Sequence, residues 1–318
     1  MITVSSATQN LRRTFIRVLT SVAIGTFVLG DAGLAFAQAP DERVWQQFLI
    51  WLPSAPPTDG ITAIYAAYRK HLLAGGASEA DADNQLAVIR MMSRTRPEAR
   101  RIMFNNVYSN EPGFNTKANA LLVSAVSGRK PGRALDVGMG QGRNAVFLAV
   151  EGWNVTGFDI SDVGLEAARK NAARVGVKIN TVLKSREEFD FGVAQWDLIV
   201  ITYETIPLET PSYAKRLRDS LRVGGVIVVE TTASDTGQPL TRSVDVDPER
   251  LLRAFDGFRI LYFEDTIAMP DWGKEKTRLA RFVAEKQRRS EGSGLVSCYS
   301  PLIVIVSANH GSSSQSGI

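Results

Sequence analysis

The stretch ALDVGMGQGRNAV, residues 134–146, decides the fold. A short apolar run leads into three glycines, Gly138, Gly140 and Gly142, and then into a segment with helical character. This order of strand, glycine turn and helix is typical of a doubly wound α/β sheet at the point where a nucleotide approaches the backbone. Gly138 permits the sharp turn, Gly140 lets a ligand come close, and Gly142 lets helix and strand pack together.

A carboxylate follows this turn at the distance that a ribose contact requires. Asp159 comes about 20 residues after Gly138, at the end of the expected strand WNVTGFDI, and can accept hydrogen bonds from two ribose hydroxyls. The dinucleotide fingerprint is G-x-G-x-x-G, whereas the spacing here is G-x-G-x-G. A nucleoside triphosphate loop needs Gly-Lys-Ser or Gly-Lys-Thr, which this turn lacks. The residues therefore predict a nucleoside site and disfavour these two ligands.

Strands and helices alternate around the turn. Continuous apolar strands separated by helices predict a parallel sheet that is covered on both faces. The last two expected strands have no full-length helix between them, which favours an antiparallel end. We expect an α/β fold with a doubly wound, mostly parallel seven-stranded sheet and an antiparallel last strand. The expected strands are 134–138, 153–160, 178–184, 196–202, 226–232, 258–265 and 278–286, and the expected helices are 143–152, 161–176 and 211–225.

A helical amino-terminal segment precedes this sheet. Val44, Phe48 and Leu52 recur at helical spacing, and Ser78 is placed to cap a later helix. We expect a helical segment at 38–117, the sheet domain at 118–288, and a disordered tail at 289–318 in which SPLIVIV has no partner. The arginine cluster is expected on a solvated helix face and consists of Arg90, Arg94, Arg96, Arg100 and Arg101.

The first 37 residues have the three-part plan of an export signal. A basic start is followed by the apolar run Val18 to Gly30, which is too short for a confident membrane span, and by small residues at Ala35 and Ala37. Arg12 and Arg13 resemble the arginine pair of a twin-arginine signal. We expect a signal peptide at 1–37 and a periplasmic or secreted protein, with a cytoplasmic or membrane-anchored chain as the alternative.

Composition excludes several kinds of site. The only cysteine is Cys298, and the only histidines are His71 and His310, so a disulfide framework and a histidine- or cysteine-based metal site are disfavoured. We expect no metal. Half of the net charge of +4 comes from residues 1–37. The excess of basic residues in the rest of the chain is therefore small, and it is weak support for a nucleic-acid partner.

The form D-x-G-x-G-x-G resembles motif I of the class I S-adenosyl-L-methionine (SAM)-dependent methyltransferases. GFDIS looks like their second motif, WDLIVIT their fourth strand, LRVGGVIVVET their fifth, and RLARFVAEK their closing antiparallel strand. The resemblance covers about residues 118–288 and is nearest to small-molecule enzymes of the tellurite-resistance type. It implies the Rossmann-like methyltransferase fold, with SAM as the methyl-donor cosubstrate and a small-molecule methyl acceptor.

The resemblance also implies the cofactor contacts. Asp136 and the turn from Gly138 to Gly142 would hold the amino-acid end of SAM, and Asp159 the ribose. The family often has Asp at the position of Ser185, and it commonly has a small residue or Cys at that of Met139. These departures leave the adenine contacts the least specified. The expected cofactor-binding residues are Asp136, Gly138, Gly140, Gly142, Asn144, Asp159, Ile160, Arg186 and Glu187.

Methyl transfer from a sulfonium needs little covalent chemistry from the protein, which fits a chain poor in His and Cys. Tyr203 and Glu204 follow the fourth strand, at the sheet edge where ligands bind, and are the expected catalytic residues; packing is the alternative for Tyr203. Trp153 and Trp196 are expected in the core. A lid over the substrate is expected from Tyr108, Phe114 and Asn115.

Other functions stay open at this point. Cys298 lies in the tail, so a cysteine nucleophile like that of cytosine-5 methylases is not expected. The fourth strand ends in ITYE, which lacks the N-P-P-Y form of amino-group DNA methylases. We therefore expect no nucleic-acid substrate. A non-catalytic SAM- or nucleoside-binding protein is one alternative, and a nicotinamide-dependent oxidoreductase is a second. We also expect no stable membrane span in the mature chain. The sequence does not specify the acceptor atom or the oligomeric state.

Overall fold

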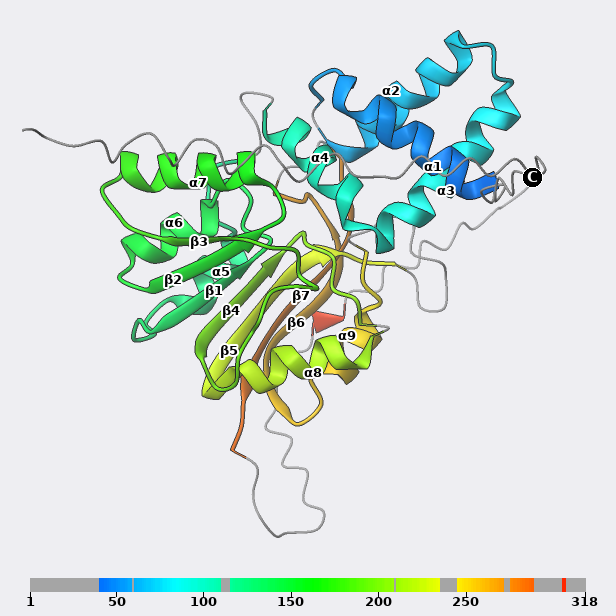
Figure 1. Cartoon of the computed structure of the whole chain (residues 1–318). Coiled ribbons are helices and arrows are strands. Elements are labelled where there is room, and N and C mark those ends of the chain that lie inside the picture. The colour runs from blue at the N-terminus through cyan, green and yellow to red at the C-terminus, as the bar shows by residue number, and fades with distance from the viewer. Residues whose placement is uncertain are drawn as a thin grey trace, which may run out of the picture. The chain divides into compact units, whose positions relative to one another are not determined.

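The computed structural model describes residues 40–58, 60–109, 115–208, 210–234, 245–271, 275–288 and 305–306. The expected leader, Phe114, Cys298 and His310 lie outside these residues. A single sheet organises the carboxyl-terminal part of the chain, with the strand order β3-β2-β1-β4-β5-β7-β6-β8 (Figure 1). The strands are β1 (Arg133–Val137), β2 (Asn154–Asp159), β3 (Asn180–Leu183), β4 (Trp196–Thr202), β5 (Leu221–Thr232), β6 (Phe258–Ala268), β7 (Thr277–Lys286) and β8 (Ile305–Val306).

The predicted α/β fold is confirmed. Strands β1 to β5 pair in parallel, and β7 runs antiparallel to both β5 and β6. The α-helices are α1 (Pro40–Trp51), α2 (Ile61–Ala74), α3 (Glu79–Thr95), α4 (Pro97–Tyr108), α5 (Ala120–Val126), α6 (Arg143–Val150), α7 (Asp162–Arg174), α8 (Pro211–Ser220) and α9 (Pro248–Ala254). A 3-10 turn, η1 (Leu52–Ser54), follows α1.

Two hydrophobic cores cover the two faces of the sheet. Along β4, Leu198 and Val200 face α5, α6 and α7, whereas Ile199 and Ile201 face α8 and α9. This alternation follows from the two-residue repeat of a strand, and it explains why the central strands are apolar throughout. Trp153 and Trp196 are buried in these cores, as predicted.

Helices α1 to α4 form the preface, residues 40–108, which has a core of its own. Trp45, Phe48, Ile64 and Tyr68 lie in that core, which draws on all four helices. Ser78 caps α3, because its hydroxyl accepts a hydrogen bond from the N–H of Asp81 at 3.1 Å. The helical character predicted for this segment is confirmed.

The solvated-face interpretation of the arginine cluster is wrong for Arg100. Its side chain is buried at the sheet domain, where it pairs with Glu187 at 3.0 Å. Arg101 pairs with Asp162 at 3.2 Å, and Arg96 with Glu42 at 2.8 Å. The helix period does not reveal this arrangement, because the partners of Arg100 and Arg101 come from a later part of the chain.

Two boundaries differ from the prediction. The helix expected at 211–225 ends at Ser220, since Leu221 already pairs with Trp196 and opens β5. In the tail, β8 pairs in parallel with Glu264 and Asp265 of β6, although the sequence suggested no partner for that run. The other tail residues from 289 onward lie outside the described ranges, so their disorder stays a prediction.

Candidate functional site

The three glycines of the turn between β1 and α6 all have left-handed backbones, with φ of +63°, +51° and +79° for Gly138, Gly140 and Gly142. A Cβ on Gly138 would lie 2.8 Å from Glu204, and one on Gly142 would lie 2.8 Å from the Cβ of Ala168 in α7. The positive φ and the lack of room for a Cβ therefore both require glycine at Gly138 and Gly142. Gly142 is predicted to let the following helix pack on β1, and the close neighbour that the structure shows is Ala168 of α7 instead.

Met139, inside the turn, packs against the neighbouring strand. A Cβ on Gly157 of β2 would overlap the Met139 sulfur, so the glycine in β2 makes room for the Met139 side chain. The Met139 N–H also donates to the Phe158 carbonyl at 3.0 Å. The turn is thus tied to β2 by both its backbone and its side chain.

Asp159 ends β2 and is bonded to the glycine turn. One carboxylate oxygen accepts from the N–H of Gly140 and the other from the N–H of Ser161, each at 2.8 Å. Burial raises the pKa of Asp159 to about 7, while the Ser161 N–H acts in the opposite direction. The residue predicted to hold a ribose therefore also holds the turn in place.

Asp136 lies beneath the same turn at the end of β1. Its Oδ2 atom is buried without a hydrogen-bond partner in the described part of the chain. Burial raises the pKa of Asp136 to about 7, and the nearby Arg143 lowers it in part. A buried carboxylate oxygen without a partner is costly, so this atom fits a ligand that brings a donor or a positive charge.

Glu204 brings a third carboxylate to the turn from the segment after β4. Arg186 is buried, and its Nη1 lies 2.6 Å from Glu204 Oε1. The same guanidinium contacts Glu187 at 3.1 Å, and Glu187 also pairs with Arg100 of α4. These four residues form a charged chain from the preface to Gly138. Arg186 and Glu187, which are among the predicted cofactor-binding residues, are both members of it.

Tyr203 has a left-handed backbone, with φ of +56°, and a fixed hydroxyl. The hydroxyl donates to Glu230 at 2.5 Å and accepts from the N–H of Asp271 at 3.1 Å. Burial, with the Glu230 carboxylate, raises the pKa of Tyr203, so the phenol stays protonated near neutral pH. Its hydroxyl can therefore serve as a donor more readily than as a general base.

A buried polar network surrounds Tyr203 and includes residues that the sequence did not single out. Asn119 donates to Glu230 at 2.9 Å and to Asp271 at 2.8 Å, and Arg143 pairs with Asp271 at 2.7 Å. The sequence held no signal for it, because Asn119 is separated from Glu230 by 111 positions and from Asp271 by 152.

Asn144, predicted to contact the cofactor, is buried beside this network. It accepts from the N–H of Asn119 and donates to the Thr202 hydroxyl, each at 2.9 Å. Ile160 follows Asp159 and is partly exposed. Asn144 thus joins the start of α6 to the end of β4, and the cofactor contacts of Asn144 and Ile160 remain predictions.

Two residues of the predicted lid lie in different places. A Cβ on Gly140 would overlap the Tyr108 hydroxyl, so Tyr108 lies directly against the turn. Asn115 instead donates to the carbonyl of Asp271 at 2.9 Å. Tyr108 therefore contacts the expected cofactor side of the site, whereas Asn115 joins the network around Tyr203.

The charges around the turn fit SAM. Three carboxylates, Asp136, Asp159 and Glu204, lie around the three glycines. SAM carries a sulfonium and an ammonium group, and both positive charges are stabilised by nearby carboxylates. The unpartnered Asp136 Oδ2 is the clearest single place for such a contact.

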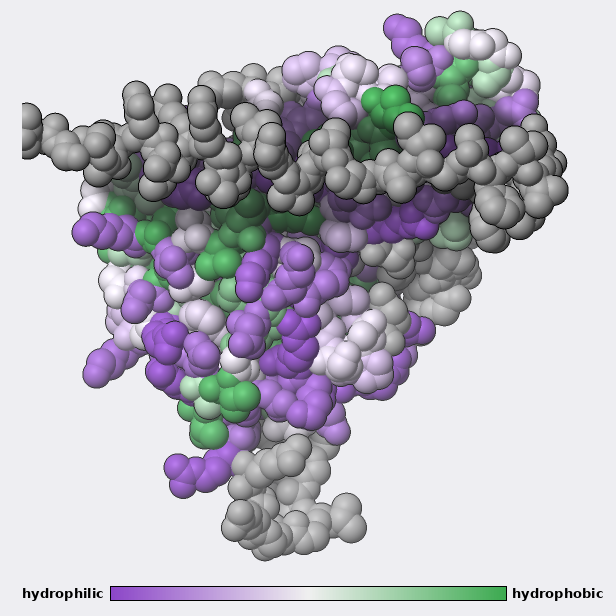
Figure 2. Space-filling model, viewed as in Figure 1, coloured by the Kyte–Doolittle hydropathy of each residue, from purple (hydrophilic) through white to green (hydrophobic). Residues whose placement is uncertain are grey.

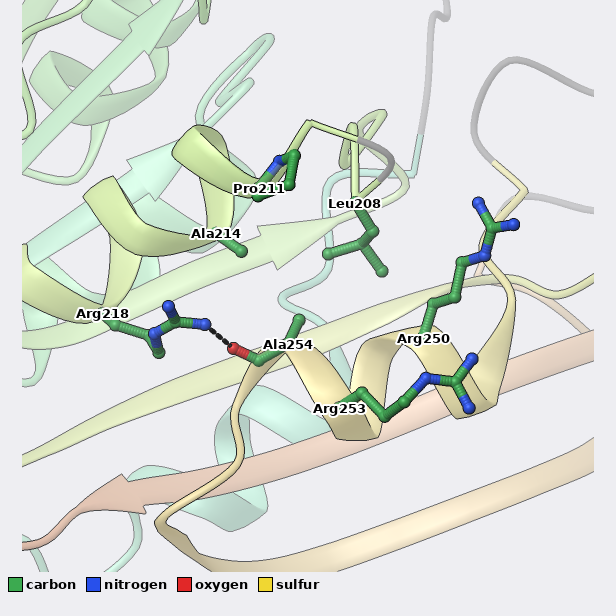
Figure 3. Close-up of a pocket in the computed structure, with 7 residues that line it drawn as sticks. All are labelled: Leu208, Pro211, Ala214, Arg218, Arg250, Arg253 and Ala254. Carbon is green, nitrogen blue, oxygen red and sulfur yellow. Dashed lines mark hydrogen bonds between the residues drawn. The ribbon is translucent and has the colours of Figure 1, made fainter.

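The described chain has other hollows away from this site. A groove with a cavity volume of about 380 Å³ lies between α8 and α9 and is lined by Arg218, Arg250 and Arg253 beside apolar side chains (Figure 3). Arg218 donates to the carbonyl of Ala254, Arg250 pairs with Asp247 at the N-cap of α9, and Arg253 pairs with Glu249 of the same helix. Among the described residues, no group of three or more His, Cys, Asp or Glu is arranged to hold a metal ion.

The visible surface over α8 is largely hydrophilic, and its apolar residues stand in small separate groups (Figure 2). None of the described helices combines the length and the apolar character that crossing a membrane requires.

Comparison with known proteins agrees with this site. Residues 134–225 match the family described as a methyltransferase domain. The probable S-adenosyl-L-methionine-dependent methyltransferase TehB from Haemophilus influenzae is 25% identical over 163 residues, 48% of this chain and 56% of that protein. Ribosomal RNA small subunit methyltransferase C from Alcanivorax borkumensis is 35% identical over 80 residues, 24% of each chain.

The chain spans about half the length of the first curated relatives that it matches, 56% and 52%. Among solved structures, the crystal structure of TehB from Haemophilus influenzae has a TM-score of 0.47 at 20% identity, covering 59% of this chain and 67% of that one. The matched family region begins at β1 and contains the glycine turn and Asp159. Residues 134–225 thus match a methyltransferase domain, and the chain is similar to the probable SAM-dependent methyltransferase TehB.

Proposed function

We propose that this protein transfers the methyl group of SAM to a small-molecule acceptor by direct in-line displacement. The observation that carries the proposal is the acidic glycine turn, in which Asp136, Asp159 and Glu204 surround the backbone of Gly138 and Gly140. SAM supplies an activated methyl group on a sulfonium. The protein has to bind it, orient it and keep water away.

The same charges disfavour a nicotinamide cofactor. A dinucleotide places its pyrophosphate at a glycine turn and at the amino terminus of the following helix. Here the carboxylates would repel that group, and Arg143 at the start of α6 is paired with Asp271 at 2.7 Å. Charge and glycine spacing therefore favour SAM over the oxidoreductase alternative.

Each carboxylate has a distinct proposed role. Asp136, with its unpartnered oxygen, would bind the ammonium of the methionine part, and Asp159 would bind the ribose hydroxyls. Glu204 lies against Gly138 with its charge balanced by Arg186, so it would border the cofactor. Tyr203, the residue before Glu204, would orient the acceptor through its hydroxyl.

The acceptor side is proposed at the carboxyl ends of β4 and β5, where Tyr203 and Glu230 meet Asp271 and Asn119. Ligands of open α/β sheets bind at this edge. The polar network offers both hydrogen-bond donors and hydrogen-bond acceptors at a partly buried site, which suits a small polar methyl acceptor. The near balance of basic and acidic residues outside the leader gives no support for a nucleic acid.

A non-catalytic SAM-binding protein is the second candidate. It is favoured by the fact that Tyr203 and Glu204 are both bonded to protein partners, Glu230 and Arg186. The two functions are separated by measuring SAM binding by calorimetry and then the formation of S-adenosylhomocysteine in the presence of a panel of small acceptors. Binding without product formation across the panel would favour the second candidate.

We also propose that the chain is exported by its amino-terminal signal. The basic start, the apolar run and the small residues before Gln38 support this. A reporter fused after Gln38 should reach the periplasm of a bacterial host, and changing Arg12→Lys together with Arg13→Lys should block it. Normal export of the double variant would leave only a general secretory signal, and a reporter retained in the cytosol would exclude export.

A further inference from the structure

Helix α4 brings one side chain into the glycine turn. Tyr108, its last residue, lies against two glycines of the sheet domain. A Cβ on Gly140 would overlap the Tyr108 hydroxyl, and one on Gly164, in the first turn of α7, would lie 2.9 Å from the ring. The space that a side chain would need at these two positions is therefore filled by a residue of the preface.

Polar contacts hold the end of α4 in this position. Asn105 donates to Asp162 at 2.8 Å and accepts from the Ser161 hydroxyl at 2.6 Å. Ser161 in turn donates its N–H to Asp159, which accepts from Gly140. The contacts connect α4, the start of α7 and the turn, so Tyr108 is fixed relative to the residues that are proposed to bind SAM.

The electrostatic surroundings of the Tyr108 hydroxyl are acidic. Asp159, Glu204 and Asp136 all act on it, and burial together with these charges raises the pKa of Tyr108. The phenol is therefore a neutral hydrogen-bond donor among carboxylates. This matters because SAM has one anionic group, the α-carboxylate, which the surrounding acidic side chains would repel.

We propose that Tyr108 is a further cofactor-site residue, whose hydroxyl donates a hydrogen bond to the α-carboxylate of the methionine part of SAM. The inference rests on the proposed function, since it assigns one more contact to the same site. It makes the preface part of the cofactor site. Tyr108 then binds the methyl donor, SAM, and is not part of the predicted lid over the methyl acceptor.

The test compares two ligands in the full chain by calorimetry. SAM has the α-carboxylate, whereas decarboxylated SAM keeps the sulfonium and the ammonium but lacks it. Tyr108→Phe removes only the hydroxyl, so it should weaken SAM binding by roughly 10- to 150-fold, the range for a hydrogen bond to a charged group. The affinity for decarboxylated SAM should stay the same in wild type and variant.

Tyr68→Phe is the matched control, because Tyr68 is buried in the separate core of the preface. It should leave both affinities unchanged. The inference is overturned if Tyr108→Phe leaves SAM affinity unchanged, raises it, or weakens both ligands equally while the wild type binds SAM. If the wild type binds neither ligand, the proposed function fails, and this inference fails with it.

Discussion

Asp159 accepts a hydrogen bond from the N–H of Gly140 at 2.8 Å, and this bond joins the end of β2 to the glycine turn that follows β1. Its second oxygen accepts from Ser161, at the start of α7. One carboxylate therefore fixes two backbone segments that border the same site. A change at Asp159 should affect both the ribose contact and the shape of the turn.

Asp159→Ala should weaken SAM binding by roughly 10- to 150-fold, because it removes a charged acceptor of hydrogen bonds. Asp159→Asn should be milder, since the amide keeps one acceptor oxygen. Calorimetry gives the affinities, and circular dichroism should show that both variants keep the fold. Unchanged SAM affinity in Asp159→Ala would remove the ribose role.

The pH dependence of stability should report on Asp136. Burial raises the pKa of Asp136 in the folded chain to about 7, above its ordinary value of 3.8. The folded chain then binds a proton at Asp136 more tightly than the unfolded chain does, so the contribution of Asp136 to stability is greatest below about pH 4 and is lost as the pH rises to about 7. The loss for one such group approaches about 1.4 kcal/mol per pH unit.

Asp136→Asn isolates this contribution from those of other groups. The unfolding free energy of the wild type minus that of the variant should fall between about pH 4 and about pH 7, as measured by denaturant unfolding. SAM affinity should change in the opposite direction and increase as Asp136 ionises, because the ligand is cationic. A flat stability difference across this window would show that the pKa of Asp136 is not raised.

The Arg186–Glu204 pair should be important for stability. The Arg186 side chain is only 5% exposed and that of Glu204 20%, so Arg186→Met would leave a largely buried carboxylate without its ion pair. We expect a loss of about 3–5 kcal/mol in unfolding free energy. Arg253→Met is the control, since its pair with Glu249 is exposed and should contribute little. Equal losses of unfolding free energy in the two variants would contradict a special role of the Arg186–Glu204 pair in stability.

Tyr203→Phe should leave SAM affinity nearly intact and lower turnover, if Tyr203 acts on the acceptor. The change also removes the hydroxyl that connects Glu230 to the backbone of Asp271. Tyr213→Phe is the control, because the Tyr213 hydroxyl is buried with no hydrogen-bond partner among the described residues. Formation of S-adenosylhomocysteine with an accepted substrate is the measurement, and equal turnover in wild type and Tyr203→Phe would exclude the role.

The sheet and the glycine turn could be predicted because their signals are local. Asp136, Gly138 and Asp159 lie at strand ends that continuous apolar runs define, and a left-handed backbone at Gly138 leaves little choice of residue. The end of α8 could not be predicted in the same way. LRVGG continues a helical pattern, but pairing of Leu221 with Trp196 starts the strand earlier.

The surroundings of the turn could not be read from the sequence, because they depend on contacts between distant residues. Tyr108 reaches Gly140 only because α4 docks on α7, and Arg100 is buried only because Glu187 faces it. The charged residues of α4 look like a solvated face when the helix is considered alone. The position of Asn119 between Glu230 and Asp271 likewise requires the folded sheet.

We propose that the turn from Gly138 to Gly142 binds SAM. Calorimetry of the purified chain with SAM, S-adenosylhomocysteine and NAD tests it directly. We predict saturable binding of SAM and of S-adenosylhomocysteine and no binding of NAD, because the carboxylates of Asp136 and Asp159 favour a cationic ligand and repel a pyrophosphate. Micromolar binding of NAD with no binding of SAM would contradict the claim.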